Sequence, residues 1–301
     1  MTAFVEHTLS FTALTADIAG QREAYSRMCR AFTPKRPAHL RVDELSLAGV
    51  AVRRYRSGPG QPPQPAVLFL HGGGWVMGNL DSHEFLTAAL ADDLGVTVLA
   101  VDYRLAPEHP FPAAFEDCLA VWRTLRVEAA RLGVDSQRVA VVGDSAGGNL
   151  AAALCLALRD TGEPQPLAQA LIYPALSSDD SLPSRGTCGD APLFGSADLD
   201  TYRAWYFAHG ADACSPYAMP LLAANFRGLA PAFISVAQFD PLHDDGVHYA
   251  KALREAGVPT TFHPGLGLVH GCLRAKGLVA EVDELYQAMM GWLHVRLIGT
   301  V

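Results

Sequence analysis

The sequence lacks both the long apolar stretch and the clustered positive charge that membrane and nucleic-acid-binding proteins carry. No apolar run approaches the roughly 20 residues that a membrane helix needs. No run of lysine and arginine interrupts the formal net charge of −8, and charged residues make up only 18% of the chain. We therefore expect neither a nucleic-acid partner nor a membrane partner.

The sequence also shows neither a cysteine-pair motif nor the pattern of a secretory signal. Its six cysteines form no C-x-x-C motif and no His/Cys spacing suited to zinc, so we expect free thiols without a disulfide or structural metal. The first 20 residues show no cationic start followed by an apolar core and a small-residue cleavage site, which is the pattern of a secretory signal. This predicts a cytoplasmic protein.

What is present is an alternation of apolar runs and helical patterns. Half of the 301 residues are apolar, which is enough for one large domain with a deep core. Short apolar runs typical of buried strands lie at 66–70, 96–101, 138–142, 168–173, 231–237 and 260–263. Helical patterns lie at 112–133, 146–158, 245–256 and 279–295. The pattern predicts an α/β fold with a doubly wound, mostly parallel central sheet flanked by helices, and antiparallel edge strands within 45–56.

Two regions interrupt this alternation. Residues 1–44 contain a helical pattern before the first strand, and residues 177–227 separate two strands by more than a usual connection. Within the second region, 199–206 is aromatic and periodic, which predicts a helix. We expect the two regions to form a helical cap over the sheet, with 45–176 and 228–301 as the core.

A G-x-S-x-G pentapeptide spans Gly143 to Gly147, with Ser145 at its centre. The motif alone is a weak signal, but here an apolar strand pattern precedes it and a small-residue helix pattern follows it. The serine of such a turn has strained backbone angles, and the flanking glycines avoid a collision there. We therefore predict that Ser145 is the nucleophile of an α/β-hydrolase. The alternative is a glycine-rich turn that packs a helix or holds a phosphate.

A second glycine cluster, His71-Gly-Gly-Gly-Trp75, follows the 66–70 strand pattern. Successive glycines expose backbone N–H groups and let a substrate carbonyl approach closely, as an oxyanion hole requires. Ala146, directly after the nucleophile, would supply a further N–H group. The alternative is a flexible turn with no catalytic role.

A serine nucleophile needs an imidazole as base and an acid behind it, in the chain order serine, acid, histidine. His270 lies in a loop after the last strand pattern and precedes Gly271, so we predict that it is the base; its competitor, His263, falls inside that strand. Asp240 comes where the 231–237 strand meets a loop, and we predict that it is the acid, with Asp244 as the fallback.

Together these motifs resemble the hormone-sensitive-lipase-like carboxylesterases, also called bacterial family IV. The matching segments are HGGGW at 71–75, DYRLAPEHPFPAAFED at 102–117, GDSAGGNL at 143–150, SPYAMPLLA at 215–223, FDPLHDDG at 239–246 and HG at 270–271. The resemblance implies an α/β-hydrolase fold with a cap, and Gly73 and Gly74 as oxyanion donors. Cys272 stands where the family usually has phenylalanine, and we expect this departure to alter the pocket wall.

Other residues near the motifs are expected to serve structure. We expect Asp102, Arg104 and Glu108 to brace the loop under the site. Asp144 should act as a structural hydrogen-bonding residue, and Trp75 should pack rather than bind substrate.

The predicted function is hydrolysis of small-molecule carboxylic esters through a Ser145–His270–Asp240 triad and an acyl-enzyme, without cofactor or metal. The resemblance implies short- to medium-chain acyl substrates and a homodimer. Two alternatives stay open. The same triad could serve an amidase, a lactonase or a thioesterase, because the cap and pocket select the leaving group. A non-catalytic binder of small molecules on the same scaffold is the other.

Overall fold

The computed structural model describes residues 1–15, 17–57 and 63–299. Its strands are β1 (Leu40–Leu47), β2 (Val50–Ser57), β3 (Gln64–Leu70), β4 (Thr97–Asp102), β5 (Val134–Asp144), β6 (Ala168–Ile172), β7 (Ala232–Ser235) and β8 (Thr260–His263). Its α-helices are α1 (Thr2–Leu9), α2 (Ile18–Ala31), α3 (Glu84–Leu94), α4 (Ala113–Val127), α5 (Ala129–Leu132), α6 (Ala146–Asp160), α7 (Pro183–Thr187), α8 (Ser196–Tyr206), α9 (His243–Glu255) and α10 (Ala280–Leu297). Short 3₁₀ turns lie at Ala208–Gly210, Pro220–Leu222 and Cys272–Ala275.

The strands form one sheet in the order β1-β2-β4-β3-β5-β6-β7-β8. β2 is antiparallel to both β1 and β4, and every other neighbouring pair is parallel. This confirms the predicted α/β fold with a mostly parallel sheet. The antiparallel edge begins at Leu40, earlier than the predicted 45–56 segment, and its hairpin turns through Ala48 and Gly49, which both have positive φ.

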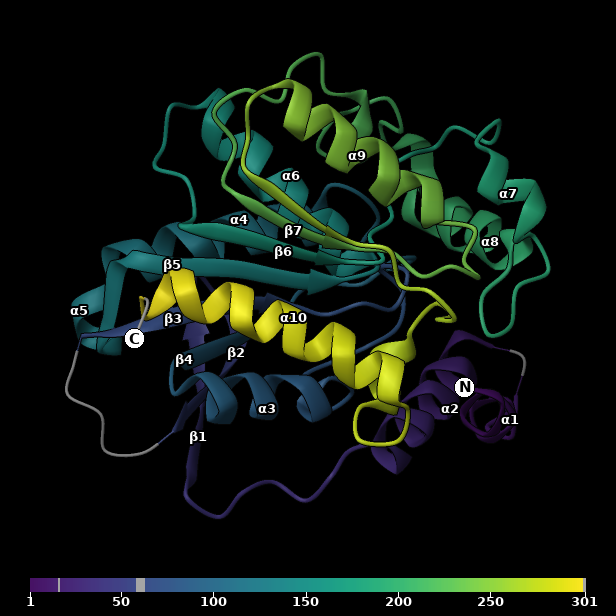
Figure 1. Cartoon of the computed structure of the whole chain (residues 1–301), viewed down its shortest axis with the longest axis horizontal. Coiled ribbons are helices and arrows are strands. Elements are labelled where there is room, and N and C mark those ends of the chain that lie inside the picture. The colour runs from purple at the N-terminus through teal and green to yellow at the C-terminus, as the bar shows by residue number, and fades with distance from the viewer. Residues whose placement is uncertain (16, 58–62, 300–301) are drawn as a thin grey trace.

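Helices cover both faces of this sheet, as Figure 1 shows. Alternate residues of β3 explain why both faces need cover. Leu68 and Leu70 belong to an apolar cluster with residues of α4, α6 and α9, whereas Val67 and Phe69 belong to a second cluster with residues of α3 and α10. Because successive side chains of a strand point to opposite faces, a strand that is apolar throughout must be buried on both.

Two helix boundaries differ from the sequence prediction. The predicted helix 112–133 is two helices, because α4 ends before Glu128 and α5 begins after it. α9 begins at His243, two residues before the predicted start at 245, so Asp244 and Asp245 both lie in its first turn and Leu242 takes the N-cap position. Acidic residues in a first turn are still favourable, because they face the positive end of the helix dipole.

The helices α1, α2, α7 and α8, which come from the two regions outside the alternation, lie at one end of the sheet. In Figure 1, α1 and α2 lie on one side of this end and α7 and α8 on the other, where the parallel strands terminate. The predicted helix at 199–206 is confirmed within α8. Among the helices of the described residues, none combines the length and apolarity that crossing a lipid bilayer demands.

Candidate active site

Ser145 occupies the sharp turn between β5 and α6. Its backbone angles are φ 54° and ψ −119°, which L-residues rarely adopt. A Cβ atom at Gly143 would overlap the carbonyl oxygen of Gly147, and a Cβ atom at Gly147 would overlap that of Leu70. The turn therefore requires glycine at both positions, which is the reason that the sequence pattern suggested.

Ser145, His270 and Asp240 form a continuous hydrogen-bonded chain. The Oγ of Ser145 lies 2.9 Å from Nε2 of His270, and Nδ1 of His270 lies 2.7 Å from Oδ2 of Asp240. Asp240 is fully buried, whereas Ser145 and His270 keep 8% and 9% of their surface exposed. A carboxylate only accepts hydrogen bonds, so the Nδ1 proton faces Asp240 and the Nε2 lone pair faces the serine hydroxyl.

The two competing candidates lie elsewhere. His263 is in β8, where its Nδ1 accepts a hydrogen bond from the backbone N–H of Gly265 at 3.2 Å. Asp244 contacts Nδ1 of His243 at 2.9 Å and accepts from the backbone N–H of Ser184 at the same distance. The structure thus brings together the first choice for each position and neither alternative.

The glycine loop after β3 presents free backbone donors to the cavity that contains Ser145. Gly73 and Gly74 have φ values of 124° and 60°, and among the described residues their N–H groups have no acceptor. A Cβ atom at Gly74 would come within 2.6 Å of the Tyr202 ring, so only glycine leaves room there. Ala146 is the first residue of α6, and the N–H group of a first helical residue has no intrahelical acceptor.

Asp144 ties this glycine loop to the nucleophile turn. Its Oδ1 accepts the Gly72 N–H at 3.0 Å and lies 3.3 Å from Nε2 of His83. Burial would raise the pKa of Asp144, but the neighbouring His83 and the Gly72 N–H outweigh burial and hold that pKa below its ordinary value. Asp144 therefore has a structural role, because its carboxylate links the nucleophile turn to the glycine loop.

His71 supports the same loop from beneath. Its ring stacks on Tyr103 with centroids 4.2 Å apart, and the Tyr103 hydroxyl donates to the His71 carbonyl at 2.6 Å. Burial, together with the nearby His83, lowers the pKa of His71 to about 3. His71 is thus a neutral packing residue. No role was predicted from the sequence for His71, His83 or Tyr103, although His71 is the first residue of the glycine motif.

Arg22 of α2 reaches across to the core. It contacts Glu108 with two hydrogen bonds of 2.7 and 2.8 Å, and donates to the carbonyl oxygens of Ala106 at 2.9 Å and Val76 at 2.8 Å. One side chain therefore connects the N-terminal helices, the 102–117 segment and the end of the glycine loop. This role of Arg22 was not predicted from the sequence, because the residues around Arg22 form no recognisable motif.

Two other expected structural roles are visible. Arg104 makes hydrogen bonds of 2.8–3.0 Å to the carboxylate of Asp117, within the 102–117 segment. Trp75 is buried and stacks on Tyr206 of α8, with ring centroids 4.2 Å apart and planes within 6°. Trp75 therefore packs the glycine loop against the 177–227 region.

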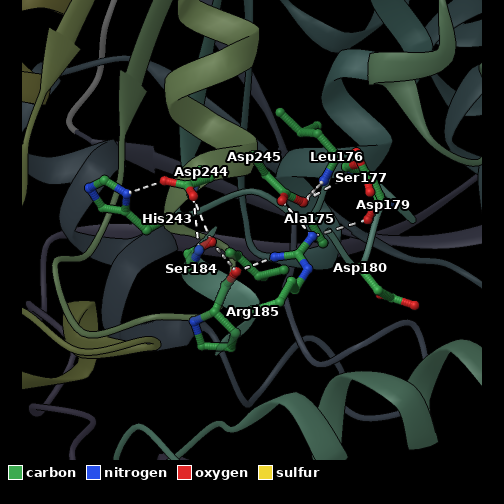
Figure 2. A network of polar contacts seen from close by, with 12 residues as sticks. Ala175, Leu176, Ser177, Asp179, Asp180, Ser184, Arg185, His243, Asp244 and Asp245 are labelled. Carbon is green, nitrogen blue, oxygen red and sulfur yellow. Dashed lines mark hydrogen bonds and ion pairs between the residues drawn. The ribbon is translucent and has the colours of Figure 1, made fainter. Parts of the chain in front are cut away.

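The loop that carries Asp240 is held by α7, as Figure 2 shows in part. The Arg185 guanidinium pairs with Asp245 of α9 at 2.5 Å, and both side chains are buried. Arg185 also donates to the carbonyl oxygen of Pro241, as does the Ser184 hydroxyl at 2.8 Å. Burial raises the pKa of Asp245 to about 6, against the opposing effect of Arg185. Pro241, which directly follows Asp240, is thus held in place by two side chains of the 177–227 region.

A cavity of about 140 Å³ opens beside Ser145. Both regions outside the alternation contribute to its wall, and Phe194 stacks on the His270 ring with centroids 4.4 Å apart. The lining residues are Thr8, Tyr25, Met28, Gly73, Gly74, Asp144, Ser145, Tyr173, Leu193, Phe194, Tyr202, His270, Gly271 and Arg274. Cys272 is fully buried and is not among these lining residues, so any effect of its replacing phenylalanine would reach the cavity wall only indirectly.

Within the described ranges, no group of three or more His, Cys, Asp or Glu side chains is placed to hold a metal ion. The cysteines are free thiols.

A family model described as alpha/beta hydrolase fold matches residues 67–274. The chain belongs to this family, and the matches below agree with the predicted hormone-sensitive-lipase-like branch. Esterase LipI of Mycobacterium tuberculosis is 41% identical over 88% of this chain and 86% of its own length. An ethyl acetate hydrolase of Pseudomonas putida is 42% identical over 81% of this chain and 79% of its own. The crystal structure of DphMB1 is similar with a TM-score of 0.86 and 40% identity, covering 98% of both chains.

Proposed function

We propose that this protein is a serine carboxylesterase in which Ser145 is the nucleophile, His270 the general base and Asp240 the residue that orients and stabilises the imidazole. The observation that carries the proposal is the chain of two hydrogen bonds, 2.9 Å from serine to imidazole and 2.7 Å from imidazole to carboxylate. The esterase names of the relatives support the same reaction class.

The reaction follows from this geometry in two halves. Nε2 of His270 takes the proton of the Ser145 hydroxyl as the oxygen attacks the acyl carbon. The resulting oxyanion accepts hydrogen bonds from the N–H groups of Gly73, Gly74 and Ala146. His270 then protonates the leaving alcohol, and an acyl-enzyme remains on the serine. Water, deprotonated by His270, attacks this acyl group. The bond between the acyl carbon and the Ser145 oxygen then breaks, His270 returns the proton to that oxygen, and the carboxylic acid leaves.

The size of the cavity supports short acyl substrates. Its volume is about 140 Å³, close to that of a cavity of about 150 Å³ that holds a benzene molecule. We propose that α1 and α2 together with residues 177–227 form a cap, because these segments supply much of the cavity wall. The cap would then set the acyl length, with preference for acyl groups of about two to four carbons.

The proposal is tested by measuring the activity of the variants Ser145→Ala and His270→Ala. Each variant should lower kcat on 4-nitrophenyl acetate by about 10⁴-fold or more, and the double variant should lose little beyond either single variant. Ser181→Ala, an exposed serine of the 177–227 region, is the matched control. A Ser145→Ala protein that keeps a tenth of wild-type activity would show that the nucleophile is another residue.

Two measurements separate the alternatives. A fluorophosphonate probe should label Ser145, identified by peptide mass spectrometry, whereas a non-catalytic binder would stay unlabelled. Ethyl acetate, S-ethyl thioacetate and N-ethylacetamide share one acyl group. We expect the oxygen ester to have the highest kcat/KM, and preference for the amide would favour an amidase.

A further inference from the structure

Arg274 brings a cation that lacks a hydrogen-bond or ion-pair partner among the described residues to the wall of the cavity beside Ser145. It lies four residues after His270, in the 3₁₀ turn Cys272–Ala275. Across residues 1–15, 17–57 and 63–299, no hydrogen bond or ion pair reaches its guanidinium, and its Nε is shielded from solvent without an acceptor. Since a guanidinium carries five N–H donors, Arg274 has donors available to a group that enters the cavity.

Apart from the Asp144 carboxylate, which favours the charged form of Arg274, the polar groups around Arg274 are neutral. Its Cζ lies 6.0 Å from the ring centroid of Tyr25. Burial raises the pKa of Tyr25 well above 10 and that of Tyr202 to about 12. Burial likewise raises the thiol pKa to about 11 at Cys29 and about 12 at Cys272. None of these neighbours carries a negative charge at neutral pH, so none compensates the guanidinium.

The carboxylates of the site are already engaged. Asp144 lies 3.3 Å from the imidazole of His83 and accepts a backbone hydrogen bond. Asp240 is fully buried and contacts His270 at 2.7 Å. Among the described residues neither carboxylate makes a hydrogen bond or ion pair with Arg274, although the charge of Asp144 favours its charged form. The N–H donors of Arg274 are therefore left for a group that enters the cavity.

The guanidinium lies against the backbone next to the proposed base. A Cβ atom at Gly271 would come within 2.6 Å of Nη2 of Arg274, so the absence of a side chain there makes the room that the guanidinium occupies. Gly271 directly follows His270 and lines the same cavity. A substrate held for attack by Ser145 therefore has this cation within a few atoms of its reacting carbonyl.

We propose that Arg274 binds a carboxylate of the substrate, so that the preferred esters carry an ionised carboxylate a few atoms from the scissile bond. This inference rests on the proposed function of Ser145. The carboxylate could stand on the acyl side, as in a monoester of a short dicarboxylic acid, or on the alcohol side, as in an acylated hydroxy acid. Both forms share the same recognition, because the planar guanidinium fork matches a carboxylate with two parallel hydrogen bonds.

Two matched substrate pairs test this inference and distinguish the two sides. On the acyl side, monoethyl succinate is compared with ethyl butyrate, in which a methyl group replaces the carboxylate. On the alcohol side, 3-acetoxypropanoate is compared with propyl acetate. The readout is the ratio of kcat/KM, charged ester over neutral ester, measured by alcohol release at pH 7.5 with an enzyme-free blank.

For the wild-type protein we expect a ratio above about 10 in one or both pairs, because a hydrogen bond between charged groups contributes about this factor to kcat/KM. Arg274→Met should lower that ratio by about 10- to 100-fold, and Arg274→Lys should restore part of it because the charge remains but the fork is lost. Arg296→Met is the matched control: Arg296 lacks a carboxylate partner among the described residues and stacks on Trp292 outside the cavity lining. It should leave the ratio within about 2-fold, because a distant charge is screened.

A wild-type ratio below 1 in both pairs would overturn the inference, and this measurement does not depend on any variant folding. An Arg274→Met ratio equal to that of wild type would overturn it as well. A failure of the proposed function gives a different result. If Ser145 is not the nucleophile, Ser145→Ala keeps its activity on the neutral esters. If only the inference about Arg274 is wrong, the neutral esters are still hydrolysed through Ser145, but the charged esters are not preferred.

Discussion

Phe194 lies over the imidazole of His270, with ring centroids 4.4 Å apart and planes 28° from parallel. The ring comes from the 177–227 region, whereas His270 comes from the loop after the last strand, so a side chain of the proposed cap shields the proposed base directly. Phe194 also lines the cavity. It therefore acts on both the orientation of the imidazole and the space for the acyl group.

Truncation of this ring should change acyl-length preference. Phe194→Ala is expected to lower kcat/KM on 4-nitrophenyl acetate by about 2- to 10-fold, the value of an aromatic contact. The relative rate on hexanoate and octanoate esters should rise, because the cavity lengthens. An acyl series from two to eight carbons measures both effects, and Phe194→Leu, which keeps an apolar wall, should fall between. An unchanged length profile would show that Phe194 does not limit the cavity.

Loss of the acceptor at Asp144 should loosen the glycine loop. Asp144→Ala leaves the Gly72 N–H without a partner, and we expect kcat to fall about 10- to 100-fold because the oxyanion donors move. Asp144→Asn keeps an acceptor oxygen and should lose less. Steady-state kinetics with circular dichroism as the fold check decide the matter. Equal losses in the two variants would mean that charge, rather than the hydrogen bond to Gly72, is what matters.

Removal of Arg185 should destabilise the fold. Arg185→Met leaves the buried Asp245 carboxylate uncompensated, which typically costs about 3–5 kcal/mol of unfolding free energy. Adding Asp245→Asn removes the stranded charge, so the double variant should recover part of the loss. Urea denaturation at pH 8 measures both. A single-variant loss below about 1 kcal/mol would contradict a tightly packed pair.

His71 should make the protein sensitive to acid. Its pKa is about 3 in the folded protein against an ordinary value of 6.5, so the unfolded chain takes up a proton first as the pH falls. The stability that the neutral imidazole contributes is complete above pH 6.5 and is lost progressively toward pH 3, at up to about 1.4 kcal/mol per pH unit. Urea denaturation between pH 7.5 and 4.5 should show a shallower pH slope in His71→Phe. Identical slopes would exclude this contribution.

The elements of the fold could be predicted because they depend on local patterns. The run at 66–70 is apolar throughout, and a short run of this kind indicates a strand that is buried on both faces. The order of Ser145, Asp240 and His270 could be predicted because each follows a strand, and parallel strands end at a common edge. Local patterns were weaker at boundaries, as at Glu128, where one periodic stretch is two helices.

The supporting contacts could not be predicted because they join segments far apart in the chain. Arg22 contacts Glu108 and Val76, and Arg185 contacts Pro241 and Asp245. An arginine in a helix has no local signature that states which distant acceptor it will reach. Arg274 likewise follows the histidine motif without any sign in the sequence that its guanidinium would lack a partner.

The reach of Arg22 has a consequence for chimeras built from relatives of this protein. An exchange of the first helices replaces part of the pocket wall and is a natural way to alter substrate range. The same exchange removes the donor that Glu108, Ala106 and Val76 share. A graft that keeps an arginine at this position transplants the wall alone, whereas one without it also frees the glycine loop that the acceptors help to hold.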